Sequence, residues 1–157
     1  MPLVYSNPQL FPNQRVTDAL VSHVDFLPTM ASLFGAPATA PWQGVDYSSV
    51  VMDPSTSVQD YIVFTYDDFQ SGQQNPPYPT PPNRVVSIRE QRWKLAEYHD
   101  PLGRKPSVFE MYDRATDPDE VKNLAFVGTT RTREQQRQYV RLRRKLERVK
   151  RTRLARL

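Results

Sequence analysis

Residues 84–125, RVVSIREQRWKLAEYHDPLGRKPSVFEMYDRATDPDEVKNLA, decide the fold of this 157-residue chain. The stretch contains three consecutive strand-like runs, at 84–90, 93–99 and 108–113. A two-residue reversal separates the first two runs, and DPLGRKP places Asp, Pro and Gly in turn positions before the third. Because strands joined by short turns pair antiparallel, the stretch predicts an antiparallel sheet.

Two segments flank these runs. Residues 61–66, YIVFTY, are β-branched and aromatic and predict a fourth, buried strand. Residues 67–83 contain five prolines and are expected to be irregular, and connections of this length are usually functional or disordered. After the third run, Thr116 or Asp117 is expected to cap a short helix around 120–124.

The amino-terminal part predicts one helix among extended connections. A short strand is possible at 2–5, and 36–59 should be mostly loop. A proline is tolerated only in the first turn of a helix, so Pro28 places a helix at 26–34. Asp25 would be its N-cap and Gly35 its stop. One apolar face of this helix is expected to hold Phe26, Met30, Leu33 and Phe34.

The carboxyl-terminal part, 129–157, has no internal proline or glycine and predicts one long helix. Its apolar residues form a narrow seam of Tyr139, Leu142, Leu146 and Val149. Residues 131–157 carry twelve Lys/Arg and two Glu, a net charge of +10, whereas 1–130 carry a net −6. We therefore divide the chain into an α+β body, 1–128, and a basic helical tail, 129–157.

Together these elements predict an α+β fold, in which a small antiparallel sheet of about four strands packs against helices and a long basic C-terminal helix follows. The chain has no cysteine, which excludes disulfides, thiolate zinc sites and cysteine nucleophiles. Its start lacks a basic segment followed by an apolar core, so no signal peptide is expected, and no apolar run is long enough to span a bilayer. We expect a soluble chain, and its localisation stays open.

Four segments carry a resemblance to a known family: VSHVDFLPTMASLFG at 21–35, GVDYSSVV at 44–51, RWKLAEYH at 92–99 and FEMYDRATDPDEVKNLA at 109–125. In order and spacing they are similar to the carboxyl-terminal third of sulfatases of the alkaline-phosphatase superfamily. The residues themselves have structural roles, because Asp113, Asp117 and Pro118 belong to turns and caps. The segments indicate a fold and contain no reaction centre.

The resemblance implies that a complete sulfatase cleaves sulfate esters with calcium and a formylglycine made from a C/S-x-P-x-R motif. Residues 6–10, SNPQL, match S-x-P, but Leu10 replaces the arginine and the position in the family pattern is wrong. In the family the metal ligands lie in an amino-terminal α/β domain that the resemblance does not cover. We therefore assign no catalytic residue and no metal ligand to this chain, and expect calcium and formylglycine only in the complete enzyme.

Three groups of polar residues are candidates for a site. Tyr66, Asp67 and Asp68 follow a strand and open the proline-rich loop, so they could border a substrate cleft or simply begin a solvated loop. The pair His23 and Asp25 suggests metal or acid–base chemistry, but helix capping explains Asp25 better. His99 with Asp100 is equally well explained as turn chemistry.

The leading hypothesis is the C-terminal subdomain or fragment of a sulfatase-like hydrolase, inactive alone, whose partner is the missing N-terminal catalytic domain. The alternative is a non-catalytic binding module whose basic helix contacts nucleic acid or an acidic protein partner. The hypothesis that the helix lies on an anionic membrane is weaker, since the apolar seam is narrow and lacks Trp or Phe. The favoured interpretation of the helix is a solvated one that docks its seam on the body or on another chain.

Overall fold

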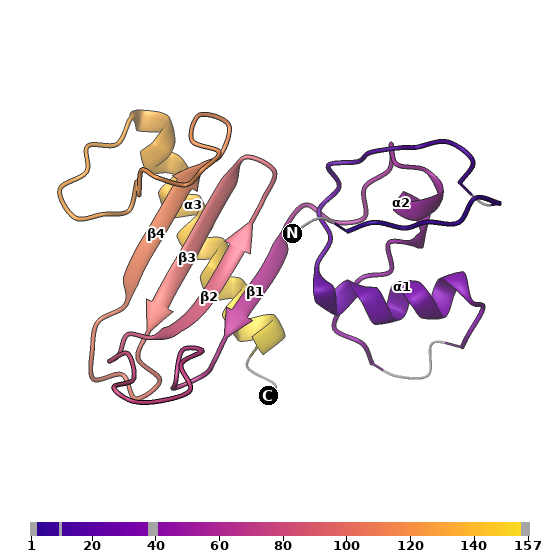
Figure 1. The fold of residues 1–157 in the computed structure, drawn as a ribbon. Coiled ribbons are helices and arrows are strands. Elements are labelled where there is room, and N and C mark those ends of the chain that lie inside the picture. The colour runs from indigo at the N-terminus through magenta and orange to yellow at the C-terminus, as the bar shows by residue number, and fades with distance from the viewer. Residues whose placement is uncertain (1–2, 10, 38–40, 155–157) are drawn as a thin grey trace. The chain divides into compact units, whose positions relative to one another are not determined.

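The computed structural model describes residues 3–9, 11–37 and 41–154. The chain divides into two compact units, Met1–Asp60 and Tyr61–Leu157 (Figure 1). Each unit has its own secondary structure and is described by itself. Among the described residues, no helix is long and apolar enough to cross a membrane.

The second unit contains one sheet of four antiparallel strands, in the order β1-β2-β3-β4. The strands are β1 (Ile62–Tyr66), β2 (Arg84–Arg89), β3 (Trp93–His99) and β4 (Val108–Asp113). Each strand pairs with the next along the chain, which makes the sheet a meander. Short turns join β2 to β3 and β3 to β4, whereas the long loop 67–83 joins β1 to β2. The predicted α+β fold with about four strands is confirmed.

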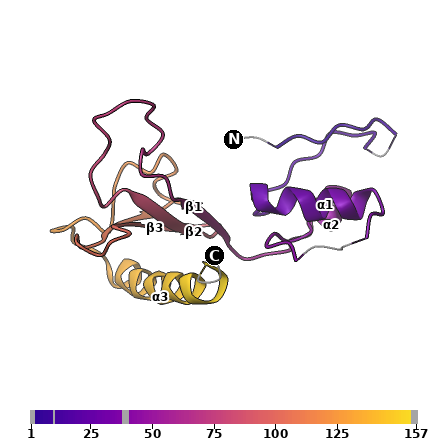
Figure 2. The ribbon, with the colours of Figure 1, turned by 90° about the horizontal axis from the view of Figure 1, so that it is seen from below.

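Helix α3 (Arg133–Val149) crosses one face of this sheet and continues into a π-helical turn, η2 (Lys150–Leu154) (Figure 2). Thr132 caps its start, because the hydroxyl accepts the Gln135 N–H at 3.2 Å. The predicted apolar seam docks on the sheet of its own unit. The core that results is formed by Val86, Ile88, Trp93, Leu95, Met111, Leu124, Leu142, Leu146 and Val149, with Tyr139 packed against it.

Ion pairs fasten α3 to the sheet as well. Glu90, just after β2, accepts from both Arg141 (2.9 and 2.5 Å) and Lys145 (2.6 Å). Glu97 on β3, whose side chain is 6% exposed, accepts from Lys150 at 2.7 Å. Arg141, Lys145 and Lys150 of the basic segment thus form ion pairs within the unit. The predicted boundary after residue 128 falls within this unit.

The Glu97 pair makes a testable contribution to acid stability. Burial raises the pKa of Glu97, but hydrogen bonds from Lys150 and Ser107 outweigh burial and hold the pKa below its usual value. A carboxyl whose pKa is lower in the folded state stabilises the fold above its unfolded pKa, about 4.3, and loses that contribution as pH falls through the folded pKa.

We therefore expect the free energy of unfolding to decrease as the pH drops below about 4.5. Glu97→Gln is expected to make that decrease smaller. Urea unfolding midpoints measured from pH 7 to pH 3 check this result. Glu110→Gln is the control, because that carboxyl lies on the neighbouring strand, accepts from the Tyr98 hydroxyl at 3.2 Å and forms no ion pair with any described residue. Equal pH slopes for wild type and Glu97→Gln would contradict the expectation.

Two predictions for this unit were wrong in detail. Strand β1 is not buried, since Phe64 is 57% and Tyr66 38% exposed. Strand β1 lies at the edge of the sheet. Helix α3 covers only one of the two faces of the sheet (Figure 2). The helix expected around 120–124 is irregular backbone instead, because Asn123 and Leu124 bond to the backbone of β4 at Phe109 and Met111.

The first unit contains a 3-10 turn, η1 (His23–Asp25), α1 (Phe26–Leu33) and the short α2 (Ser48–Met52). The helix predicted at 26–34 is thus confirmed to within a residue, whereas α2 lies in the predicted loop. The possible strand at 2–5 is wrong for its described residues, since 3–5 form no strand, and residue 2 lies outside the described residues.

The buried face of α1 also differs from the prediction. Phe26 (49%) and Phe34 (82%) are exposed, while Thr29 is fully buried. The reason is polar: the Thr29 hydroxyl donates to Asp25 O at 2.6 Å and accepts the Tyr47 N–H at 3.0 Å. This bridge holds the 44–47 segment against the polar side of the helix and leaves its aromatic side open.

Candidate functional site

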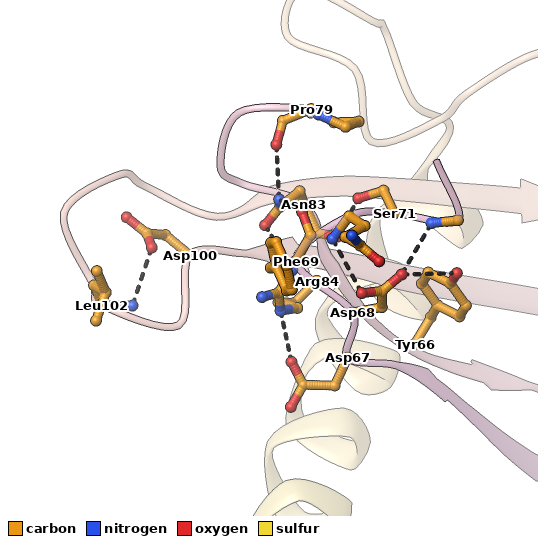
Figure 3. A network of polar contacts seen from close by, with 12 residues as sticks. Tyr66, Asp67, Asp68, Phe69, Ser71, Pro79, Asn83, Arg84, Asp100 and Leu102 are labelled. Carbon is orange, nitrogen blue, oxygen red and sulfur yellow. Dashed lines mark hydrogen bonds and ion pairs between the residues drawn. The ribbon is translucent and has the colours of Figure 1, made fainter. Parts of the chain in front are cut away.

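The predicted rim residues lie at one end of the sheet, where β1 ends, β2 begins and β3 ends. The strand registers pair Tyr66 with Val85 and Arg84 with His99, which places these strand ends side by side. Asp67, Asp68 and Asp100 follow directly. Figure 3 shows this end of the sheet and its network of polar contacts.

Arg84 is the residue that sequence reasoning missed. Its Nε lies 2.7 Å from Asp67 Oδ1, and its side chain is only 12% exposed, whereas that of Asp67 is 79% exposed (Figure 3). The arginine thus holds a solvent-facing carboxylate at the sheet end. Only the antiparallel register brings Arg84, seventeen positions along the chain, beside Asp67.

Asp68 has a different role, because its carboxylate organises the loop. Oδ1 accepts the Gln70 N–H and Oδ2 accepts the Gly72 N–H, each at 3.0 Å, and the Tyr66 hydroxyl donates to Oδ2 at 3.4 Å. The two backbone donors hold the pKa of Asp68 below its usual value. The carboxyl group of Asp68 is therefore ionised at neutral pH, and both of its oxygens already accept hydrogen bonds from the loop.

The loop 67–83 is irregular, as predicted, but it is held together by its own side chains. Phe69 and Tyr78 meet edge to face with ring centroids 5.4 Å apart. The Asn83 amide donates to Pro79 O at 2.8 Å and to Phe69 O at 3.3 Å (Figure 3). The peptide bonds Pro76–Pro77 and Pro81–Pro82 are cis. The outcome is a compact loop that begins and ends at the candidate rim.

Asp100 behaves like Asp68. It accepts the N–H groups of Leu102, Arg104 and Lys105 at 3.0–3.1 Å, and these bonds lower its pKa. This is the turn chemistry predicted for His99–Asp100. A general acid needs a pKa raised toward neutrality, and Asp68 and Asp100 are shifted the other way. Neither Asp68 nor Asp100 is therefore suited to act as a general acid at neutral pH.

His23 and Asp25 do not support the metal interpretation. His23 is exposed, while Asp25 is 2% exposed and accepts from the Ser22 N–H (2.8 Å), the Val45 N–H (2.8 Å) and Gln59 Nε2 (2.7 Å). Asp25 is the residue before α1, as predicted, but its side chain makes no bond to that helix. It ties three segments of the first unit together.

The family resemblance implies a calcium site in the complete enzyme. Calcium takes six to eight oxygen ligands. Among residues 3–9, 11–37 and 41–154, no group of three or more His, Asp or Glu side chains could hold a metal ion. The described residues thus do not fit a calcium site of their own.

Comparisons with known proteins agree with this geometry. The family model for "N-sulphoglucosamine sulphohydrolase, C-terminal" matches residues 1–152. Sulfatase C-terminal domains are thus the class that fold and sequence define. The chain belongs to the N-sulphoglucosamine sulphohydrolase C-terminal family, and the predicted resemblance is confirmed. No curated protein gives a significant match.

Solved structures share the fold. A protein in complex with its substrate D-glucosamine-2-N,6-O-disulfate matches 81% of this chain at 21% identity and TM-score 0.59. A 2-O GAG sulfatase matches 80% at 22% identity and TM-score 0.54. A protein from work on the metabolism of multiple glycosaminoglycans by Bacteroides thetaiotaomicron matches 87% at 20% identity and TM-score 0.60. This chain spans only 23–28% of the length of these proteins.

Proposed function

We propose that this chain is the C-terminal part of a sulfatase whose remaining part cleaves sulfate from a sulfated sugar. The family match over residues 1–152 carries the proposal, because it covers nearly the whole chain. The 23–28% span of the structural neighbours supports a larger enzyme around it. The calcium ion and formylglycine expected of such an enzyme would be held by that larger part.

Exposed apolar side chains support a missing neighbour in each unit. In the first unit Phe26, Leu27 and Phe34 are 49–82% exposed on and after α1. In the second unit Phe64 and Tyr66, two positions apart and so on one face of edge strand β1, are 57% and 38% exposed. Apolar groups gathered in this way mark surfaces that another protein part covers. The missing N-terminal catalytic domain is the partner we propose for them.

The two aspartates of the proposed rim, which consists of Tyr66, Asp67 and Asp68, have different roles. Asp68 shapes the loop, and Arg84 positions Asp67, whose carboxylate stays accessible to a ligand. A carboxylate accepts hydrogen bonds from hydroxyl or amino groups, and it repels sulfate. We propose that Asp67 contacts an unsulfated position of the sugar beside the cleft. Relatives that act on sulfated glucosamine make an amino sugar the substrate class to test.

The proposal is tested by joining this chain to a sequence that carries a C/S-x-P-x-R motif and acidic metal ligands, taken from immediately upstream in its gene. The joined protein is expected to hydrolyse glucosamine N-sulfate or an aryl sulfate, whereas the 157-residue chain alone is expected to release none. Calcium-dependent turnover by the isolated chain would overturn the proposal. So would an upstream sequence without these motifs.

The rim is tested in the same joined protein. Asp67→Asn is expected to raise KM about fivefold with kcat little changed, because a contact to a bound sugar that is not reacting affects ground state and transition state alike. Thr80→Ala, at the far part of the same loop, is the matched control and should leave both constants unchanged. A fall in kcat at constant KM would show that Asp67 does not hold substrate in this way.

A further inference from the structure

The outward face of α3 carries four exposed arginines, of which Arg141 alone forms an ion pair with another described residue. Arg137, Arg141, Arg144 and Arg148, here called the arginine strip, recur at spacings of four, three and four. Such spacing puts them on one face of a helix, over about 16 Å of its length. All four are exposed, whereas Leu142 and Leu146, on the sheet side, are fully buried.

The members of the strip differ in their partners. Arg141 donates to both oxygens of Glu90 and, through Nε, to Gln138 Oε1 at 2.6 Å. Arg137, Arg144 and Arg148 have no ion pair with any described residue. A shallow hollow between these side chains is lined by Gln136, Arg137, Val140, Arg141, Arg144, Lys145 and Arg148. Carboxylates are absent from that lining, so the hollow favours an anion.

Arginine chemistry narrows the kind of anion. A guanidinium group presents parallel N–H donors that bind an oxyanion through two bonds at once. Single exposed ion pairs are weak, so three guanidinium groups in a row are useful only to a ligand that repeats its charge along its length. The strip therefore fits a linear polyanion.

The surroundings of the strip favour a sulfated polysaccharide over other polyanions. Single-stranded nucleic acid needs exposed aromatic rings for stacking, but Tyr139 and Phe109 already lie under Arg131 and Arg143, and neither ring lines the hollow. An anionic membrane needs an apolar face to insert, and the apolar face of α3 is docked on the sheet. Val140 is the one apolar side chain in the hollow.

We propose that the arginine strip is an accessory site that binds the sulfate groups of a sulfated polysaccharide. The site lies on the helix face opposite the sheet, and its members are separate from the rim residues Tyr66, Asp67 and Asp68. It would keep a long substrate chain attached while its end is processed. This inference rests on the proposed function for the choice of polyanion. The strip itself rests on the contacts of α3.

The experiment compares two triple variants of the 157-residue chain. Arg137→Gln, Arg144→Gln and Arg148→Gln together remove the unpaired strip charges. Arg104→Gln, Lys105→Gln and Lys122→Gln remove the same charge from exposed loop positions of the same unit. Binding to dextran sulfate is measured by titration at several salt concentrations, with neutral dextran and duplex DNA as further probes.

We expect the strip variant to bind dextran sulfate about tenfold more weakly and to lower the slope of log affinity against log salt by about two to three. The loop variant should change affinity less than about threefold. Equal losses in both variants, or none in the strip variant, would overturn the inference. Thermal unfolding of both variants checks that the fold is intact.

Two further outcomes separate the inference from its premise. Tighter binding of duplex DNA than of dextran sulfate at equal salt would assign the strip to nucleic acid and reject the polysaccharide. Failure of the joined protein to cleave any sulfate, with strip-dependent dextran sulfate binding intact, would reject the proposed function and leave a polyanion-binding module. Failure of strip-dependent binding in an active joined protein would reject the accessory site alone.

Discussion

Replacing Leu146 with alanine is expected to lower the free energy of unfolding of the second unit by about 2–5 kcal/mol. Leu146 is fully buried between α3 and the sheet, so the substitution removes its contacts and leaves a cavity. Urea unfolding followed by the fluorescence of Trp93, which belongs to the same core and is 5% exposed, measures the loss.

Val140→Ala is the matched control, because Val140 lies on the same helix and is 40% exposed. Its effect is expected to stay within about 0.5 kcal/mol. If Leu146→Ala were as mild as Val140→Ala, α3 would not be a stabilising part of the unit. The expected contrast would show that the basic segment is as much core as surface, with one face in the sheet and the other in solvent.

This two-sided helix shows what sequence could predict. The seam of Leu142, Leu146 and Val149 was readable from its periodicity. Periodicity left open whether the seam docks on the body or on another chain, and the fold shows that it docks on the sheet of its own unit. The pairs that fix it, Glu90 with Arg141 and Glu97 with Lys150, join residues more than fifty positions apart. Nothing local distinguishes those cations from Arg144 or Arg148. Their division into paired and unpaired sets requires the fold.

The errors have the same origin. The aromatic run at 61–66 predicted a strand correctly, but whether a strand is buried depends on what covers it, and β1 is an edge strand. The residues at 120–124 could have formed a helix alone, but bonds from Asn123 and Leu124 to β4 compete successfully. Local propensity loses to tertiary hydrogen bonds in such short segments.

Only part of the candidate site could be predicted from the sequence. Asp67 and Asp68 were candidates because they follow a strand and open a long loop, and their part in a substrate cleft stays a prediction. Sequence could not separate their roles, since Asp68 is distinguished only by the N–H groups of Gln70 and Gly72 that it accepts. Arg84 had no local signal at all. The family resemblance, in contrast, was fully readable, because turn and cap residues such as Asp117 keep their spacing.

Asp25→Ala is expected to destabilise the first unit by about 3 kcal/mol, because it leaves buried donors without an acceptor. The carboxylate of Asp25 is 2% exposed and accepts from Ser22, Val45 and Gln59 at 2.7–2.8 Å. Gly44 lies close by and tolerates no side chain, since a Cβ there would come within 1.9 Å of Val24 O. The backbone of Val24 and Asp25 is thus packed directly against Gly44.

Hydrogen exchange of the Val45 amide, which donates to Asp25 Oδ1, measures this loss directly. Asp25→Asn keeps one acceptor oxygen and should retain part of the protection. Asp53→Ala is the control, because that exposed carboxylate accepts only within its own turn, from Ser55. Unchanged protection in Asp25→Ala would mean that the carboxylate does not hold the unit together. If low temperature restores the activity that Asp25→Ala loses in the joined protein, the role of Asp25 is to stabilise the fold. If the activity stays lost at every temperature, Asp25 takes part in the reaction.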